Sequence, residues 1–212
     1  MNLTKKMILA LGLLAAGVSY GQTQADGRFG QGLLGQRYTE LNVGLQDIKH
    51  SADHAYSVGA EANNPVIPGV LDAGASYSYS WIRGGSFKGH ANTIGAYATA
   101  YAPMNGVKPF AGAALGYQWT SVRFAGSDEQ ALWGLTTGVE IPAGERITVT
   151  PRLSYADDFE GSPRSSQAWT LAVEANYWFN KTSAVYGSIG RSDVRRNPFD
   201  SWNYEVGLRA RF

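Results

Sequence analysis

The sequence predicts an all-β protein that forms a closed antiparallel barrel across a membrane. Hydrophobic and polar residues alternate with period two along most of the chain after residue 35, as in strands whose two faces meet different surroundings. The composition combines 12% aromatic residues and 26 Gly with only 17% charged residues, which favours a β-rich fold over disorder. The apolar run over 7–18 is too short to be a preferred helical span. Any membrane contact must therefore be made by strands.

Charge and cysteine content exclude several classes of function. The formal net charge is +1, so nothing indicates a nucleic-acid partner. The chain has no Cys, which excludes a disulfide scaffold, a thiolate metal site and a Cys nucleophile. We expect no cofactor, no metal and no catalytic residue, although some His and Asp residues are candidates for an enzyme at the barrel rim.

The N-terminus has the pattern of a secretory signal. Lys5 and Lys6 precede the apolar run, and Ser19 and Gly21 provide small residues after it. We predict a signal peptide over 1–21, with cleavage after Gly21 or, alternatively, after Ala25. A Gly- and Gln-rich periplasmic lead follows over 22–35, and the barrel covers 36–212.

Ten segments are expected to be strands in a meander. In 168–179, for example, Trp169, Leu171 and Val173 lie on one face, and Glu174 and Asn176 lie on the other. The faces of 89–102 cannot be assigned. Eight strands remain an alternative, because the link over 63–70 is long for a turn. The expected strands are 36–47, 54–62, 71–83, 89–102, 108–121, 131–142, 147–156, 168–179, 184–192 and 202–212.

The polar face of these strands favours a narrow lumen over a solvated surface. It consists mostly of Gly, Ala, Ser and Thr with single charges, whereas a soluble barrel would carry many Lys, Glu and Thr side chains toward water. Isolated charges inside a lumen must find partners, and Glu140 and Arg152 are expected to meet across one hairpin. The predicted lumen ion-pair residues are Glu40, Glu61, Glu140, Arg152, Glu174, Glu205, Arg209 and Arg211.

Aromatic residues are expected to form two girdles on the outside of the barrel. If strands alternate up and down, five tryptophans fall at one end, which also carries the longer links. Such belts mark the two interfaces of a bilayer. The first girdle contains Trp81, Trp119, Trp133, Trp169 and Trp202, and the second contains Tyr38, Phe110, Tyr177 and Phe212.

The last eight residues carry a resemblance to a known signal. The segment 205–212, with Glu205, Gly207, Ala210 and the terminal Phe212, resembles the β-signal of bacterial outer-membrane proteins. With the signal peptide, the chain resembles the small outer-membrane barrels of the OmpA-transmembrane, OmpX and opacity-protein type. This resemblance implies a Gram-negative outer membrane, insertion by the barrel-assembly machinery, and lipid and lipopolysaccharide as surroundings.

Three functions fit these features. The first is a structural or surface-interaction protein with a lumen filled by side chains and short external loops. A porin-like narrow pore for small solutes is the alternative. The third is a rim enzyme that acts on lipid or peptide, for which His50, Asp53, His54, Asp157 and Asp158 are the candidates. These residues do not reproduce the omptin pattern, so solvated loop residues are the favoured interpretation. The sequence identifies no external ligand.

Overall fold

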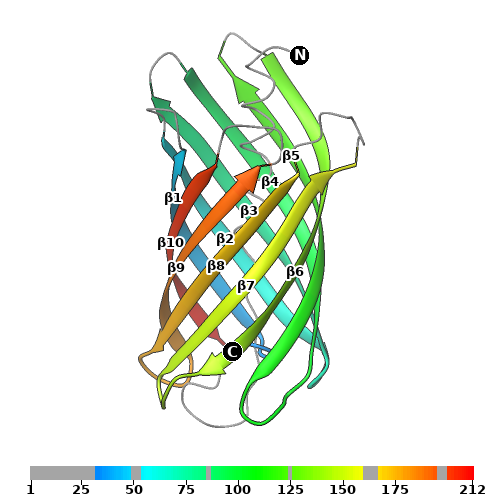
Figure 1. The fold of residues 1–212 in the computed structure, drawn as a ribbon, viewed down its shortest axis with the longest axis vertical. Coiled ribbons are helices and arrows are strands. Elements are labelled where there is room, and N and C mark those ends of the chain that lie inside the picture. Colours follow the sequence, from blue (N-terminus) through cyan, green and yellow to red (C-terminus); the bar gives the residue numbers. More distant parts are fainter. Residues whose placement is uncertain (1–31, 49–53, 85–86, 124–125, 160–166, 195–199) are drawn as a thin grey trace.

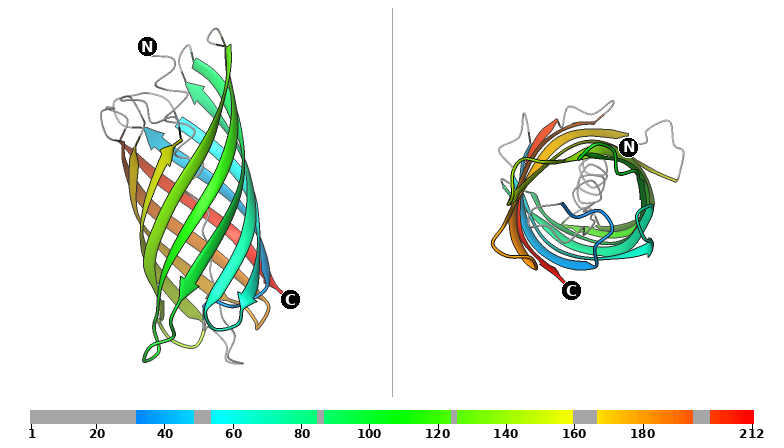
Figure 2. Two further views of the ribbon diagram at one scale, coloured as in Figure 1. Left: turned by 90° about the vertical axis from the view of Figure 1, so that its right-hand side faces the viewer. Right: turned by 90° about the horizontal axis from the view of Figure 1, so that it is seen from below.

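The protein is a closed barrel of ten antiparallel strands in the described part of the chain (Figures 1 and 2). The structure is a computed structural model that describes residues 32–48, 54–84, 87–123, 126–159, 167–194 and 200–212. Within these ranges, no helix has the length and apolarity needed to span a membrane. The strands are β1 (Tyr38–Ile48), β2 (His54–Ile67), β3 (Leu71–Gly84), β4 (Phe87–Tyr101), β5 (Lys108–Val122), β6 (Gly126–Pro142), β7 (Ile147–Asp158), β8 (Ala168–Trp178), β9 (Ser183–Val194) and β10 (Ser201–Arg211).

Each strand pairs with its neighbours in sequence, and β10 closes the barrel on β1. The closing ladder runs from Tyr38 opposite Arg211 to Ile48 opposite Ser201. Closure leaves no unpaired sheet edge, a condition that a sheet surrounded by lipid must meet. The fold class, the meander order and the preferred count of ten strands are thereby confirmed.

Burial alternates along the strands as the period-two pattern predicts. In β10, Leu208 is 61% exposed and the adjacent Arg209 is 3% exposed. In β8 the polar side chains of Glu174 and Asn176 point into the lumen, while Val173 points outward. The faces of β4 are also defined: Tyr97 and Tyr101 are buried in the lumen and the alanines between them face outward. Aromatic side chains on the inner face obscured this alternation in the sequence.

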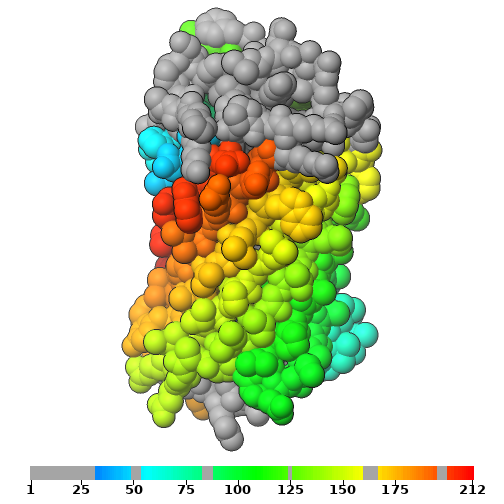
Figure 3. Space-filling model, in the orientation of Figure 1, coloured from blue at the N-terminus to red at the C-terminus, as the bar shows by residue number. Residues whose placement is uncertain are grey.

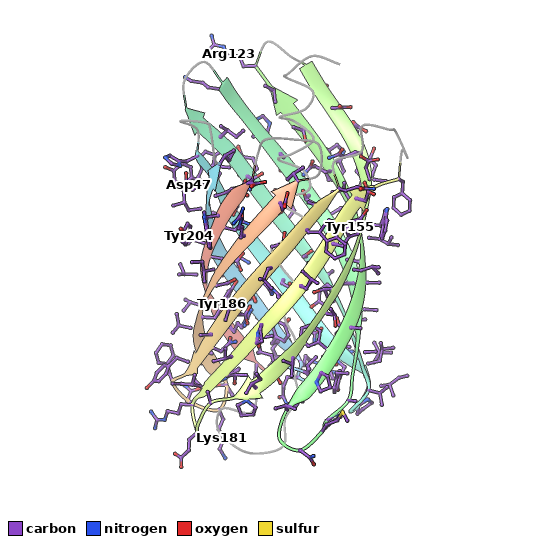
Figure 4. All side chains as sticks on the ribbon, viewed as in Figure 1. Asp47, Arg123, Tyr155, Lys181, Tyr186 and Tyr204 are labelled. Carbon is purple, nitrogen blue, oxygen red and sulfur yellow. The ribbon has the colours of Figure 1, made fainter. Side chains whose placement is uncertain are left out.

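Short turns connect the strands at one end of the barrel, which we call the turn end. Lys181 marks it at the bottom of Figure 4, whereas Arg123 lies at the opposite loop end. Asn105 and Gly106 both have positive φ, 46° and 86°, and the bridge from Met104 to Val107 flanks them. Two successive residues with positive φ are typical of the tight type I′ hairpin, which favours Asn-Gly. The link expected over 63–70 is shorter than predicted, because β2 continues through a bulge to Ile67.

The outer surface carries an apolar band bounded by aromatic side chains. The space-filling view in Figure 3 shows this face as a continuous wall of oblique strands. Near the loop end, Tyr155, labelled in Figure 4, contacts Trp133 and Trp169 at ring-centroid distances of 5.3 and 4.9 Å. Trp81 stacks on Tyr56, with ring centroids 5.9 Å apart. Trp119, Trp169 and Trp202 are exposed, and Trp81 and Trp133 are half-buried.

The girdle at the turn end differs from the expected one. Tyr177 and Phe212 are exposed on the outside, but Tyr38 and Phe110 are 0% and 5% exposed and lie in the lumen. The assignment of Tyr38 and Phe110 to the outer girdle was therefore wrong. Tyr38 shares its face with Glu40, and Phe110 shares its face with Gln118, so strand alternation requires both rings to point inward.

The predicted signal peptide over 1–21 lies outside the described residues. Of the lead over 22–35, only residues 32–35 are described, and Leu33 and Leu34 are buried inside the turn end of the barrel.

Candidate functional site: a charged layer across the lumen

Arg209 on β10 is the centre of a network of buried polar side chains, which we call the charged layer. Its Nε lies 2.6 Å from Glu40 Oε2 on β1, and its Nη1 lies 2.6 Å from Glu174 Oε1 on β8. The second guanidinium nitrogen, Nη2, donates to Glu174 Oε2 at 3.1 Å, so the contact with Glu174 is bidentate. Arg209 thus joins strands on both sides of β10, and its side chain is only 2% exposed.

Tyr186 on β9 packs against this guanidinium. The Arg209 Cζ atom lies 3.7 Å from the centroid of the Tyr186 ring, within the range of a cation–π contact. The Tyr186 hydroxyl contacts both Glu40 and Glu205. In Figure 4 the labelled Tyr186 lies between Lys181 at the turn end and Tyr204 nearer the loop end. One phenol therefore connects the carboxyl groups of β1 and β10.

Glu40 and Glu61 occupy directly opposite positions on β1 and β2, where two like charges repel. Their side chains take different partners. Glu40 binds Arg209 and accepts from Asn42 Nδ2 at 2.9 Å. Glu61 accepts hydrogen bonds from the hydroxyls of Tyr38 at 2.5 Å and Tyr97 at 2.7 Å. Hydroxyl donors from β1 and β4 thus hold the Glu61 carboxyl group inside the lumen.

In the part of the lumen nearer the turn end, three aromatic rings each lie over a glycine that is directly opposite on the neighbouring strand. The pairs are Tyr97 with Gly74, Phe110 with Gly138, and Tyr186 with Gly207. At each glycine, a Cβ atom would occupy the position of the ring. Glycine is needed here because the rings lie flat across the sheet, which lets them fill the lumen near the charged layer.

The predicted contact between Glu140 and Arg152 does not form, because each side chain binds another partner. Glu140 Oε1 lies 3.2 Å from Lys108 Nζ on β5, and Arg152 Nη1 lies 3.5 Å from Glu174 Oε2 on β8. Glu140 and Arg152 are not directly opposite on the ladder, since Arg152 is opposite Gly138. Lys108 was missed as a lumen residue, although it has the same strand parity as Gln118.

Arg211 also faces inward, near the turn end. Its guanidinium lies 3.4 Å from the ring centroid of Trp178, which is fully buried, and it donates to the carbonyl of Gly32. Every predicted lumen residue therefore lies inside the barrel. Sequence reasoning missed the lumen tyrosines and Trp178. The available signal was strand alternation, which places these side chains on the same face as Glu40, Glu174 and Arg209 of their own or a paired strand.

Of the rim residues of the catalytic alternative, the three that the structure describes, His54 on β2 and Asp157 and Asp158 on β7, do not come together into one site. His50 and Asp53 lie outside the described residues. His54 Nδ1 lies 3.4 Å from Asp47 at a half-exposed position. Asp157 and Asp158 belong to β7 rather than to a loop, and Asp157 accepts from the Tyr155 hydroxyl at 2.9 Å. Among the described residues, no group of three His, Asp or Glu side chains could hold a metal ion.

The four residues of the terminal signal divide between the two faces of β10. Glu205 and Gly207 point into the lumen, where they contact Tyr186. Ala210 and Phe212 face outward, and Phe212 is 73% exposed. The backbone N–H of Phe212 donates to the carbonyl of Arg37 at 3.2 Å.

Comparisons with solved structures place the fold among bacterial outer-membrane barrels. The translocator domain of the autotransporter NalP from Neisseria meningitidis has a TM-score of 0.59 and 8% identity, covering 99% of this chain and 97% of that domain. The β domain of the Bordetella autotransporter BrkA has a TM-score of 0.50 and 15% identity, covering 84% of this chain and 99% of that one. The NanC porin has a TM-score of 0.50 and 9% identity, covering 82% and 100%. No protein-family profile and no curated protein sequence matches the chain.

Proposed function

We propose that the protein is an outer-membrane barrel with a closed lumen and a structural or surface-interaction role, not an enzyme. The observation that carries this proposal is the charged layer. Its buried ion pairs and hydrogen bonds connect β1, β2, β4, β7, β8, β9 and β10. A lumen whose side chains bind one another across this many strands favours closure over steady conduction.

The loop end supports a role at the cell surface. β6 begins at Gly126, and its first four residues are all exposed. Glu129 among them accepts a hydrogen bond from the hydroxyl of Tyr117 on β5 at 2.6 Å. Figures 1 and 2 show the β5–β6 hairpin projecting beyond the loop-end limits of β8, β9 and β10. This hairpin extends the barrel wall and presents polar side chains beyond the tryptophan girdle.

The closed lumen predicts that the purified protein is electrically silent. After insertion into a planar lipid bilayer we expect no steady current, whereas a conducting porin in the same membrane provides the positive control. Swelling of proteoliposomes in a neutral sugar should also match that of protein-free vesicles. Steady single-channel steps from the unmodified protein would instead support the narrow pore.

The terminal residue tests the proposed route into the outer membrane. We propose that the barrel-assembly machinery recognises the segment ending in Phe212 and inserts the chain among outer-membrane lipid and lipopolysaccharide. Deleting Phe212 removes one exposed ring from the folded barrel, so unfolding in detergent should change little. The amount of protein in the outer-membrane fraction of cells should fall strongly.

Phe179 offers the matched control for this deletion, because it is also an exposed ring at the turn end, 52% accessible. Phe179→Ala should leave the cellular amount close to that of the wild type. Heat-modifiability on gels measures the folded fraction of both variants. A normal cellular amount of the folded Phe212 deletion would contradict recognition of the terminal signal.

A further inference from the structure

Residues 32–36, which precede Arg37 and β1, lie inside the turn end of the barrel, and we call them the plug. Two consecutive leucines anchor it. Leu33 and Leu34 are 1% and 0% exposed and belong to two separate apolar clusters. The clusters contain Leu33 with Tyr38, Trp178 and Ala184, and Leu34 with Tyr101 and Phe110.

The two clusters lie on opposite walls of the lumen. Tyr101 and Phe110 belong to β4 and β5, whereas Trp178 and Ala184 belong to β8 and β9. In a closed ring of ten strands, β4 and β9 are diametrically opposite. The plug therefore spans the lumen rather than lining one side, and it fills the centre that the wall side chains surround.

Polar contacts attach the plug to four further positions around the mouth. The backbone N–H of Leu33 donates to Glu140 Oε2 at 2.5 Å, and that of Gly35 donates to Asp72 Oδ2 at 2.7 Å. Asn63 Nδ2 donates to the carbonyl of Gln36 at 2.9 Å, and Arg211 donates to that of Gly32. Carboxylates from β3 and β6 thus accept hydrogen bonds from backbone N–H groups of the plug that take no part in a strand ladder.

Displacement of the plug would leave the paired strands of the barrel unchanged. The contacts of the plug are outside the strand ladders: the closing ladder of β1 with β10 begins at Tyr38, and the Phe212 N–H donates to Arg37, which lies between the plug and β1. Gly32 and Gly35 both have positive φ, 69° and 83°, and a side chain on Gly32 would meet the Glu140 carboxylate. Displacement of the plug would expose the polar groups that hold it, which water can solvate, together with the apolar side chains of the two clusters.

We propose that the plug is the gate of the lumen, and that its displacement opens a path for small cations. This proposal rests on the closed lumen of the proposed function, and it identifies the plug as the segment that closes the lumen. Among the described residues, the charged layer and the turn-end mouth hold more carboxyl groups than cationic side chains. The six carboxyl groups are those of Glu40, Glu61, Asp72, Glu140, Glu174 and Glu205, and the four cationic side chains are Lys108, Arg152, Arg209 and Arg211. An excess of carboxyl groups along a narrow path favours cations.

The test uses the natural absence of cysteine in the chain. Leu34→Cys places one thiol in the plug, and the folded protein is inserted into a planar bilayer before a bulky, membrane-impermeant maleimide is added to both sides. The label can react only when the plug leaves its site, and it then prevents its return. We expect a silent membrane before the reagent and a steady, cation-selective current after it, measured as a reversal potential in a KCl gradient.

Ile67→Cys provides the matched control, since Ile67 is half exposed at the turn end outside the plug. The thiol of this control should react at once without any current. The thiol of the Leu34→Cys variant should react about tenfold more slowly or slower still, because labelling must wait for local opening. Leu33→Cys, in the other cluster, repeats the test if Leu34→Cys does not fold by heat-modifiability.

Each outcome of the labelling experiment decides the proposal. A Leu34→Cys protein that mass spectrometry shows to be fully labelled but that stays silent overturns the gate. A thiol that never reacts shows that the plug does not leave, and an anion-selective current overturns the cation path. A steady current from the unmodified wild-type protein contradicts the closed lumen itself, independently of the plug.

Discussion

Replacing Arg209 with methionine is expected to destabilise the folded barrel by about 3–5 kcal/mol, the cost of removing one partner from a buried ion pair. The side chain is almost fully buried and binds Glu40 and Glu174 at 2.6 Å each. Without the guanidinium, both carboxylates remain in the lumen, and Glu174 keeps only the longer 3.5 Å contact with Arg152 among its ion pairs. Urea unfolding in lipid vesicles measures the loss.

Arg191→Met on the neighbouring β9 is the matched control. Arg191 also forms an ion pair, with Asp200 at 3.3 Å, but its side chain is 49% exposed. Exposed pairs contribute only about 0–1 kcal/mol, so this variant should unfold close to the wild type. Adding Glu40→Gln and Glu174→Gln to Arg209→Met should recover much of the stability, because neither carboxylate is then left without its guanidinium. Equal effects of Arg209→Met and Arg191→Met would contradict the central role of Arg209.

Val173→Arg is expected to weaken folding into lipid by about 2–4 kcal/mol, the cost of an arginine on the lipid face near the middle of a barrel strand. Val173 is 43% exposed on β8, and the adjacent Glu174 points into the lumen. The new guanidinium would therefore meet hydrocarbon and could not reach the carboxyl groups of the charged layer. The folded fraction in vesicles, measured by heat-modifiability, reports this loss.

Asn180→Arg tests whether position rather than charge causes the effect. Asn180 follows β8 in the exposed turn before β9 and accepts hydrogen bonds from Thr182 and Ser183. An arginine there lies outside the apolar band, so the folded fraction should fall only slightly. Equal folding of Val173→Arg and the wild type would show that this face of β8 does not contact lipid.

Particular residues show which side-chain directions the period-two pattern predicts correctly. It assigns Glu174 to the lumen and Val173 to the outside, because neighbours in a strand must face opposite ways. The same rule, applied to Tyr38 and Phe110, would have placed both in the lumen. Aromatic residues near strand ends are usual at a bilayer interface, but that tendency does not override strand parity.

The partners of the lumen charges depend on more than one hairpin. Glu140 and Arg152 are near neighbours along the chain, yet each binds a side chain from a strand on its other side. Arg209 reaches over β9 to Glu174 because Tyr186 lies flat on Gly207 beneath it. The contact of Arg209 with Glu174 depends on the curvature of the closed barrel, which brings strands two apart within reach of one side chain.

Local alternation and turn residues predict the meander order, which face of most strands is charged, and ten strands as the preferred count, with eight as the alternative that only the closed ring excludes. The tertiary structure decided which charges pair, which aromatic rings fill the lumen and where the residues before β1 lie. Leu33 and Leu34 belong to no strand and show no periodicity, so no local rule places them. Their position follows from the closed ring, which surrounds them with apolar and carboxyl side chains from opposite walls.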